Sequence, residues 1–103
     1  KDMIISGSEN IYSAELEFVL AECADLAEST VVARPDERWG EVPVAVVVKL
    51  PDSEITKAEV LDLFADRLAR YKHPKDVLFT DALPRNAMGK VLKFEVREML
   101  RKG

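Results

Sequence analysis

Hydrophobic residues concentrate in the middle of the chain, where residues 41–50 contain five valines. So dense a run predicts a central strand covered on both faces. Pro43 is expected near the start of this strand, where a missing N–H is tolerated. The β-branched run at residues 30–32 predicts a second strand over residues 28–34, antiparallel to the first. We expect residues 35–37 to interrupt that second strand.

The first part of the chain predicts a hairpin followed by a helix. Residues 3–6 and 10–12 are short extended segments, and a tight turn at Gly7 and Ser8 joins them. Ser13 is expected to cap a helix over residues 14–24. The buried stripe of that helix follows the i, i+3, i+4, i+7 pattern and comprises Leu16, Val19, Leu20 and Cys23.

The second half of the chain predicts a helix, a strand and a last helix. Thr56 and Glu59 form a capping box that opens the first of these, which ends before Pro74. Residues 77–80 then form a third strand, parallel to a neighbour, because a strand–helix–strand crossover precedes it. The last helix covers residues 93–101. The expected inward residues are Leu61, Phe64, Ala65 and Leu68 in the first helix, and Leu92, Val96, Met99 and Leu100 in the last.

These elements define an α+β fold in one domain spanning residues 1–103. Its expected core is a small three-stranded mixed sheet packed by three helices and preceded by a short β-hairpin. Such a fold says little about function by itself.

Composition narrows the possible functions. The 103 residues are 48% hydrophobic and 33% charged, which is typical of a globular protein. The net charge of -4 argues against nucleic acid as a partner, because phosphate binding favours a basic surface. No apolar run approaches the roughly 18–20 residues that a membrane span requires. We therefore expect a cytoplasmic domain.

The sequence gives no reason to expect a metal site. Cys23 is the only cysteine and His73 the only histidine, so neither a disulfide nor a zinc-binding spacing is available. Cys23 is expected to be a core thiol. The chain begins with Lys1, not methionine, and runs directly into an apolar segment. This start favours a fragment of a longer protein.

One turn-rich segment is a candidate for chemistry, and it reads LPRNAMGKVLK, residues 83–93. Pro84, Asn86 and Gly89 predict a loop that presents Lys90. A solvated surface lysine is the ordinary alternative.

The chain resembles the C-terminal domain of the adenylate-forming enzymes, the superfamily of acyl-CoA synthetases, luciferases and peptide-synthetase adenylation domains. The resemblance runs over the whole chain, in order, through the segments KDMIISGSENIYSAELE, RPDERWGEVPVAVVV, YKHPKDV and LPRNAMGKVLK. It implies that a large ATP-binding domain is absent from this chain.

The resemblance implies that Lys90 is catalytic. In the family's reaction a carboxylate and ATP form an acyl-adenylate, and CoA then forms the thioester. Lys90 would bridge the carboxylate and the α-phosphate, where a positioned cation stabilises the transition state. The motif is also similar to a target of protein acetyltransferases, and acetylation of Lys90 would remove the charge.

The same resemblance assigns a hinge and part of a CoA site. Lys1 falls at the hinge position, with a linker charge as the alternative, and Asp2 beside it is expected to tie down the following loop. Gly7, Ser8 and Glu9 would line the pantetheine tunnel, although Ser8 stands where a second glycine is common.

Four further residues are implied for CoA. Trp39 would offer an aromatic face to the adenine, or else simply pack over the sheet edge. His73 and Lys75 would meet the CoA phosphates, with Tyr71 nearby, or else their segment only stops a helix.

The leading hypothesis is the C-terminal domain of an ATP-dependent acyl-CoA ligase, inactive in isolation. Magnesium, ATP and the acyl group would bind the missing domain. The alternatives are a small α+β interaction module, or the same domain from an adenylating enzyme that does not use CoA.

Overall fold

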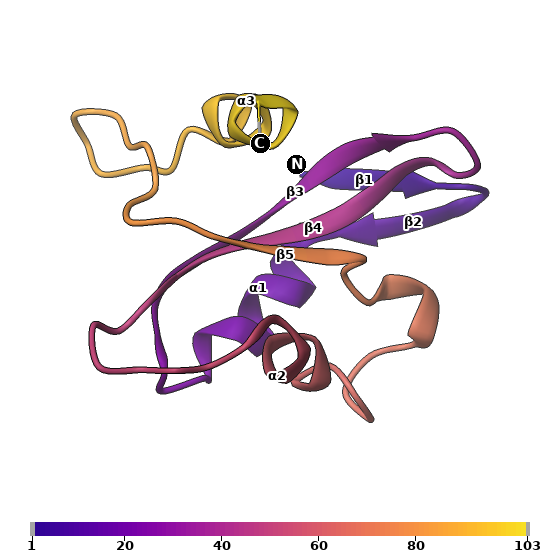
Figure 1. Cartoon of the computed structure of the whole chain (residues 1–103). Helices are drawn as coiled ribbons and strands as arrows, with labels where there is room; N and C mark the ends of the chain where they lie inside the picture. Colours follow the sequence, from indigo (N-terminus) through magenta and orange to yellow (C-terminus); the bar gives the residue numbers. More distant parts are fainter. Residues whose placement is uncertain (1, 103) are drawn as a thin grey trace.

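The computed structural model describes residues 2–102 and confirms the α+β class, with three helices packed on one sheet (Figure 1). The strands are β1 (Met3–Ser6), β2 (Glu9–Tyr12), β3 (Leu26–Asp36), β4 (Gly40–Lys49) and β5 (Asp76–Phe79). The helices are α1 (Ser13–Ala21), α2 (Lys57–Asp62) and α3 (Lys93–Lys102), with a short 3-10 turn, η1, at Arg70–Lys72.

Strand β4 organises the sheet. It pairs with β3 in the predicted antiparallel sense along one edge, and with β5 in the predicted parallel sense along the other. The hairpin β1–β2 does not stand apart from the sheet as the sequence suggested, because Ser6 pairs with Gly40 at the start of β4. The sheet therefore has five strands in the order β2-β1-β4-β3, with β5 beside β4.

The sheet has a hydrophobic core on each face, as the valine pattern predicted for a central strand. Ala45 and Val47 of β4 face α1 and α2, while Val44 and Val46 face the side covered by α3. Figure 1 shows α1 and α2 on one side of the sheet and α3 on the other. Val96 is the fully buried residue of α3. The chain must therefore pass from one layer to the other between β5 and α3.

The expected interruption of the second strand at residues 35–37 is wrong for two of the three positions. Strand β3 continues through Pro35 and Asp36, which pair with Glu41 and Gly40. The turn comes later because the Asp36 carboxylate accepts hydrogen bonds from the N–H groups of Arg38 and Trp39 at 3.0 and 2.8 Å. The side chain of Asp36 thus closes the β3–β4 connection.

Two expectations about the first helix are also wrong. Ser13 is the first helical residue and its side chain caps nothing, because its hydroxyl donates to the carbonyl of Asp2 at 3.2 Å. Helix α1 ends at Ala21, so Cys23 lies beyond it and is only half-buried. Leu16, Val19 and Leu20 are buried as predicted.

The second helix begins as predicted and ends early. The capping box of Thr56 and Glu59 is present, but α2 stops at Asp62 and the chain then turns through Asp66 at φ 65°. Ala65 is consequently exposed, contrary to prediction, while Val60 is fully buried. Phe64 is buried as predicted.

Within residues 2–102, no helix has the length and apolar character required to cross a bilayer. The same residues contain no group of three or more His, Cys, Asp or Glu side chains arranged to hold a metal ion.

Asp76 joins three elements at the start of β5. Its carboxylate lies 3.4 Å from Arg34 of β3 and 3.6 Å from Lys57 of α2, and it accepts from the N–H of Val77 at 2.7 Å. The Val77 N–H is the main cause that holds the pKa of Asp76 below its ordinary value, and the charges of Lys57 and Arg34 act in the same direction. Partial burial opposes them.

We predict that Asp76→Asn destabilises the fold in a pH-dependent way. A lowered folded-state pKa means that the charged carboxylate stabilises the fold above the unfolded pKa of about 3.9. This stability is lost as the pH falls through the lower, folded-state pKa. Because the side chain is 45% exposed, we expect a loss of at most about 1 kcal/mol.

Chemical unfolding from pH 7 down to pH 2 measures this effect. The difference between wild type and Asp76→Asn should shrink on acidification, whereas the exposed control Asp52→Asn should show no such trend. A constant difference across the range would contradict the assignment.

Candidate functional site

The loop that carries Lys90 is closed around the side chain of Asn86. The Asn86 carboxamide oxygen accepts from the N–H groups of Met88 and Lys90, both at 2.9 Å. The main chain adds two more bonds of 2.9 Å, from Asn86 N–H to the Lys90 carbonyl and from Gly89 N–H to the Asn86 carbonyl. Gly89 has φ +85°, a conformation that favours glycine. The backbone at Lys90 is therefore held in one geometry.

Arg85 attaches this loop to the sheet. Its guanidinium donates to the Gly89 carbonyl at 2.6 Å and pairs with Glu28 of β3 at 2.8 Å. The stem of the loop is closed by a bridge between Arg85 and Val91. Arg85 thus supports the loop from within and attaches it to β3.

The Lys90 side chain is exposed and borders a cleft of about 470 Å³. Among residues 2–102 its ammonium group has no ion-pair or hydrogen-bond partner. The cleft lies beside the first described residue, and its other lining residues are Asp2, Tyr12, Ser13, Ala14 and Glu17. The structure therefore places two predicted site residues, Lys90 and Asp2, on one cleft.

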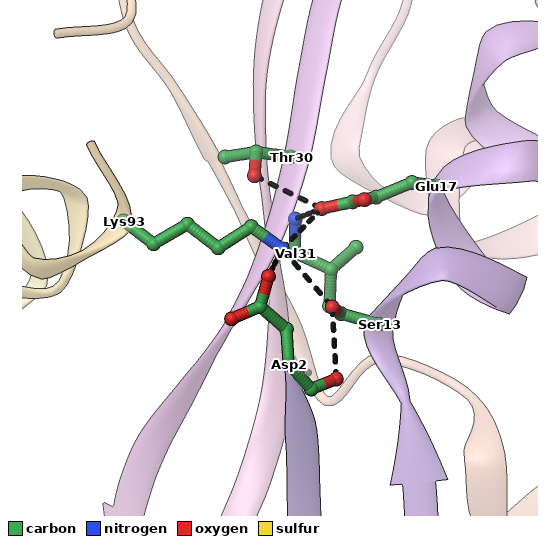
Figure 2. Close-up of polar contacts among 6 residues, drawn as sticks. All are labelled: Asp2, Ser13, Glu17, Thr30, Val31 and Lys93. Atoms are coloured by element: carbon green, nitrogen blue, oxygen red, sulfur yellow. Dashed lines mark hydrogen bonds and ion pairs between the residues drawn. The ribbon is translucent and has the colours of Figure 1, made fainter. Parts of the chain in front are cut away.

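Asp2 contacts Ser13 and Lys93, while Lys1 lies outside the described residues. The carbonyl of Asp2 accepts from the Ser13 N–H at 3.0 Å, and its carboxylate lies 3.2 Å from Lys93 (Figure 2). Lys93 was not among the predicted site residues. A lysine at the first position of a helix was the available signal, because the helix dipole disfavours a cation there.

A second group of predicted residues gathers where the β1–β2 turn meets the β3–β4 turn. The Gly7 N–H donates to the Trp39 carbonyl at 2.6 Å, and Gly7 has φ +62°. A Cβ at position 7 would come within 3.0 Å of the Trp39 ring, so the glycine permits the contact. Ser8 and Glu9 follow on the exposed tip of the hairpin.

Trp39 both packs and remains accessible. Its ring lies on Gly7, and the Arg38 guanidinium stands 4.8 Å from the ring centroid. Yet 44% of Trp39 is exposed. Asp36, which the sequence analysis treated as a strand breaker, orients this side chain by fixing the turn.

The segment with Tyr71, His73 and Lys75 lies at the same end of the sheet. The Lys75 N–H donates to the Pro43 carbonyl at 2.8 Å, which sets this segment beside the start of β4. His73 Nε2 is 2.9 Å from the Leu68 carbonyl, and its ring packs on Phe64. One His73 nitrogen is therefore engaged by the protein itself, whereas Tyr71 and Lys75 are exposed.

The predicted residues form two separate surfaces. Figure 1 shows the loop between β5 and α3 at one end of the molecule, and the turns of both hairpins at the other. Lys90 and Asp2 belong to the first surface, and Gly7 and Trp39 to the second.

We predict that Gly7→Ala disturbs the second surface. The new methyl group meets both an unfavourable φ and the Trp39 ring, so we expect a loss of about 1–3 kcal/mol of stability. Since Trp39 is the only tryptophan in the chain, its fluorescence maximum should shift. Gly89→Ala is the matched control, because its φ is also positive while a Cβ there has no neighbour within 4 Å. Equal fluorescence changes in both variants would contradict this account.

Comparison with known proteins gives the same family as the sequence motifs. Residues 15–90 match the family described as the AMP-binding enzyme C-terminal domain. The chain is 57% identical, over 97% of its length, to an indoleacetate–CoA ligase of Aromatoleum aromaticum. It is 47% identical, over 95% of its length, to the long-chain-fatty-acid–CoA ligase FadD13 of Mycobacterium tuberculosis.

Structural similarity is equally extensive. The crystal structure of apo MatB from Rhodopseudomonas palustris aligns with 99% of this chain at a TM-score of 0.94 and 40% identity. The chain covers 20% of the indoleacetate–CoA ligase, 19% of FadD13 and 20% of MatB, about a fifth of each. With a family match that extends over most of its length, this chain belongs to the AMP-binding enzyme C-terminal domain family.

Proposed function

We propose that this chain is the C-terminal domain of an ATP-dependent, AMP-forming acyl-CoA ligase and that Lys90 is its adenylation residue. The observation that carries the proposal is that the backbone at Lys90 is held in place while its ammonium group stays free of protein partners among the described residues. Six hydrogen bonds and ion pairs hold the loop backbone and Arg85. None of them involves the Lys90 ammonium, which faces solvent on the cleft that Asp2 also lines. The names of the relatives as CoA ligases support the same function.

The proposed chemistry uses Lys90 as a positive charge carried on a backbone of defined geometry. In adenylation a carboxylate oxygen attacks the α-phosphorus of ATP, and the bond to pyrophosphate breaks. Negative charge then crowds on the attacking oxygen and the phosphoryl oxygens. An ammonium group brought to this centre by the loop stabilises the charge distribution.

The rest of the active site is proposed to lie outside this chain. The chain spans about a fifth of its curated relatives, which leaves room for a large domain that binds ATP, magnesium and the acid. The open side of the Lys90 cleft would receive that domain. We propose accordingly that residues 1–103 act as a mobile lid and are inactive in isolation.

CoA is proposed to contact the second surface. Trp39 offers an exposed aromatic face suited to the adenine, and the backbone of Gly7 is suited to close approach by the thin pantetheine arm. The Lys75 ammonium suits the CoA phosphates, with Tyr71 beside it. His73 is a weaker candidate, because Nε2 already contacts the Leu68 carbonyl. Glu9 completes the tip as a lining residue.

Two further parts of the proposal concern the location of the protein in the cell and its modification there. A cytoplasmic location stays a prediction. So does modification of Lys90 by a protein acetyltransferase, which the exposure of Lys90 and of Met88 at 92% would permit.

We predict that Lys90→Ala in the full-length enzyme lowers the rate of adenylation about a hundred- to a thousandfold. Thioester formation from a supplied acyl-adenylate should stay close to wild type, because the new bond then forms at the acyl carbon and the attack on phosphorus that Lys90 is proposed to assist is already complete. Pyrophosphate exchange and a CoA-dependent thioester assay measure the two steps. Lys102→Ala, in the last turn of α3, is the control. Equal loss in both steps would overturn the assignment.

We predict that Ser8→Gly lowers the apparent KM for CoA. Ser8 is absent from the positions with positive φ, so the turn does not itself require glycine there, and the side chain only occupies space at the tip. Removing an intruding side chain is worth about 1 kcal/mol, or about fivefold.

Ser8→Ala separates the two parts of that side chain. It removes the hydroxyl group and keeps the Cβ, so an intermediate KM is expected. Should Ser8→Gly leave the KM for CoA unchanged while another acceptor reacts faster than CoA, the domain would belong to an adenylating enzyme that does not use CoA.

A further inference from the structure

Lys93 stands where a cation is electrostatically unfavourable. It is the first residue of α3, whose N-terminal end carries the positive pole of the helix dipole. Only 17% of its side chain is exposed. A lysine in this place requires acceptors that compensate its charge. The positions of those acceptors show which parts of the fold Lys93 joins.

The partners of Lys93 come from the opposite layer of the fold. Its ammonium lies 2.8 Å from the Glu17 carboxylate of α1, 3.2 Å from the Asp2 carboxylate and 3.0 Å from the Ser13 hydroxyl (Figure 2). An ammonium group has three donors, and these three acceptors match them. The charge is therefore fully compensated.

Glu17 connects this cluster to the sheet. Its Oε2 also accepts from the Thr30 hydroxyl at 3.0 Å and from the Val31 N–H at 2.9 Å. Both groups belong to β3, an edge strand of the sheet. Lys93 and Glu17 thus meet over that edge and join the layer of α3 to the layer of α1.

The Lys90 loop consequently has two attachments to β3. The stem before Lys90 is attached by Arg85 to Glu28, and the stem after it by Lys93 to Glu17, which binds Thr30 and Val31. The second attachment also holds Asp2, the first described residue of the chain. One ammonium therefore fixes both the catalytic loop and the point where the chain enters.

We propose that Lys93 is a positioning residue for adenylation, which orients Lys90 relative to the segment that precedes the domain. This inference rests on the proposed role of Lys90. The Glu17 contact is the more enclosed, with 28% of the Glu17 side chain exposed. The Asp2 carboxylate is 63% exposed, so Asp2→Asn loosens the entry of the chain with little effect on folding.

The test uses the full-length enzyme with Asp2→Asn, Lys93→Met and Lys93→Arg. We expect Asp2→Asn and Lys93→Met to lower kcat of adenylation about ten- to a hundredfold with an unchanged KM for ATP. Thioester formation from supplied acyl-adenylate should stay within about twofold of wild type. Lys93→Arg keeps the charge and should recover most of the rate. The double variant Asp2→Asn/Lys93→Met should be no slower than Lys93→Met alone.

Amide hydrogen exchange measures how firmly the Lys90 loop is held, without any need for the adenylation reaction. Exchange of the Gly89 and Lys90 N–H groups, which bond to Asn86, should accelerate in Lys93→Met and not in Arg97→Met, on the same helix. Unchanged exchange together with unchanged adenylation would overturn the positioning role. So would a parallel loss of both half-reactions that follows a lower melting temperature.

The variants also separate this inference from the proposed function. If Lys90→Ala leaves adenylation intact, the proposed function fails, whatever Lys93 does. If Lys90→Ala abolishes adenylation and Asp2→Asn and Lys93→Met do not slow it, only the positioning role fails. Because Lys93→Met leaves Glu17 without its cation and risks unfolding, Asp2→Asn decides that case.

Discussion

Burial of β4 on both faces is the constraint on which the rest of the molecule depends. Its alternate side chains enter two separate cores, one under α1 and α2 and the other under α3. A strand of this kind needs a layer on each side. The chain must therefore leave β5 in one layer and reach α3 in the other. The segment that makes this passage is the loop that carries Lys90, so the position of this loop follows from how the core is covered.

The same arrangement explains why two lysines three residues apart behave so differently. Lys90 projects from the passage between the layers and faces an open cleft. Lys93 begins α3, close to the edge of β3, where the carboxylate of Glu17 from the other layer comes within 2.8 Å. Burial with three matched acceptors fixes Lys93, whereas exposure leaves the Lys90 ammonium available. Local environment, not residue type, separates the anchored lysine from the exposed one.

The two candidate surfaces lie at opposite ends of a sheet that the two cores make rigid. In the proposed function one surface serves adenylation and the other serves thioester formation. In that function the two surfaces would serve one active site in turn if the domain reorients as a unit. The attachment of Asp2 to Lys93 then matters, because it fixes how the domain is held at the end from which such a motion would start.

The sequence by itself determined the elements whose signals are local. The valine run, the antiparallel partner of β4, the capping box at Thr56 and the turn that presents Lys90 were all predictable, because periodicity, cap chemistry and turn residues act over a few positions. The motifs also identified the family.

Only the tertiary structure decided where polar side chains find distant partners. Ser13 looked like a helix cap, yet its hydroxyl binds the Asp2 carbonyl and the Lys93 ammonium. Asp36 looked like a strand breaker, yet it closes the turn that holds Trp39. Lys93 meets Glu17 across 76 positions of sequence. The physical reason is that a hydrogen bond or ion pair depends on separation in space, which a pattern of residues along the chain does not specify until the layers have packed.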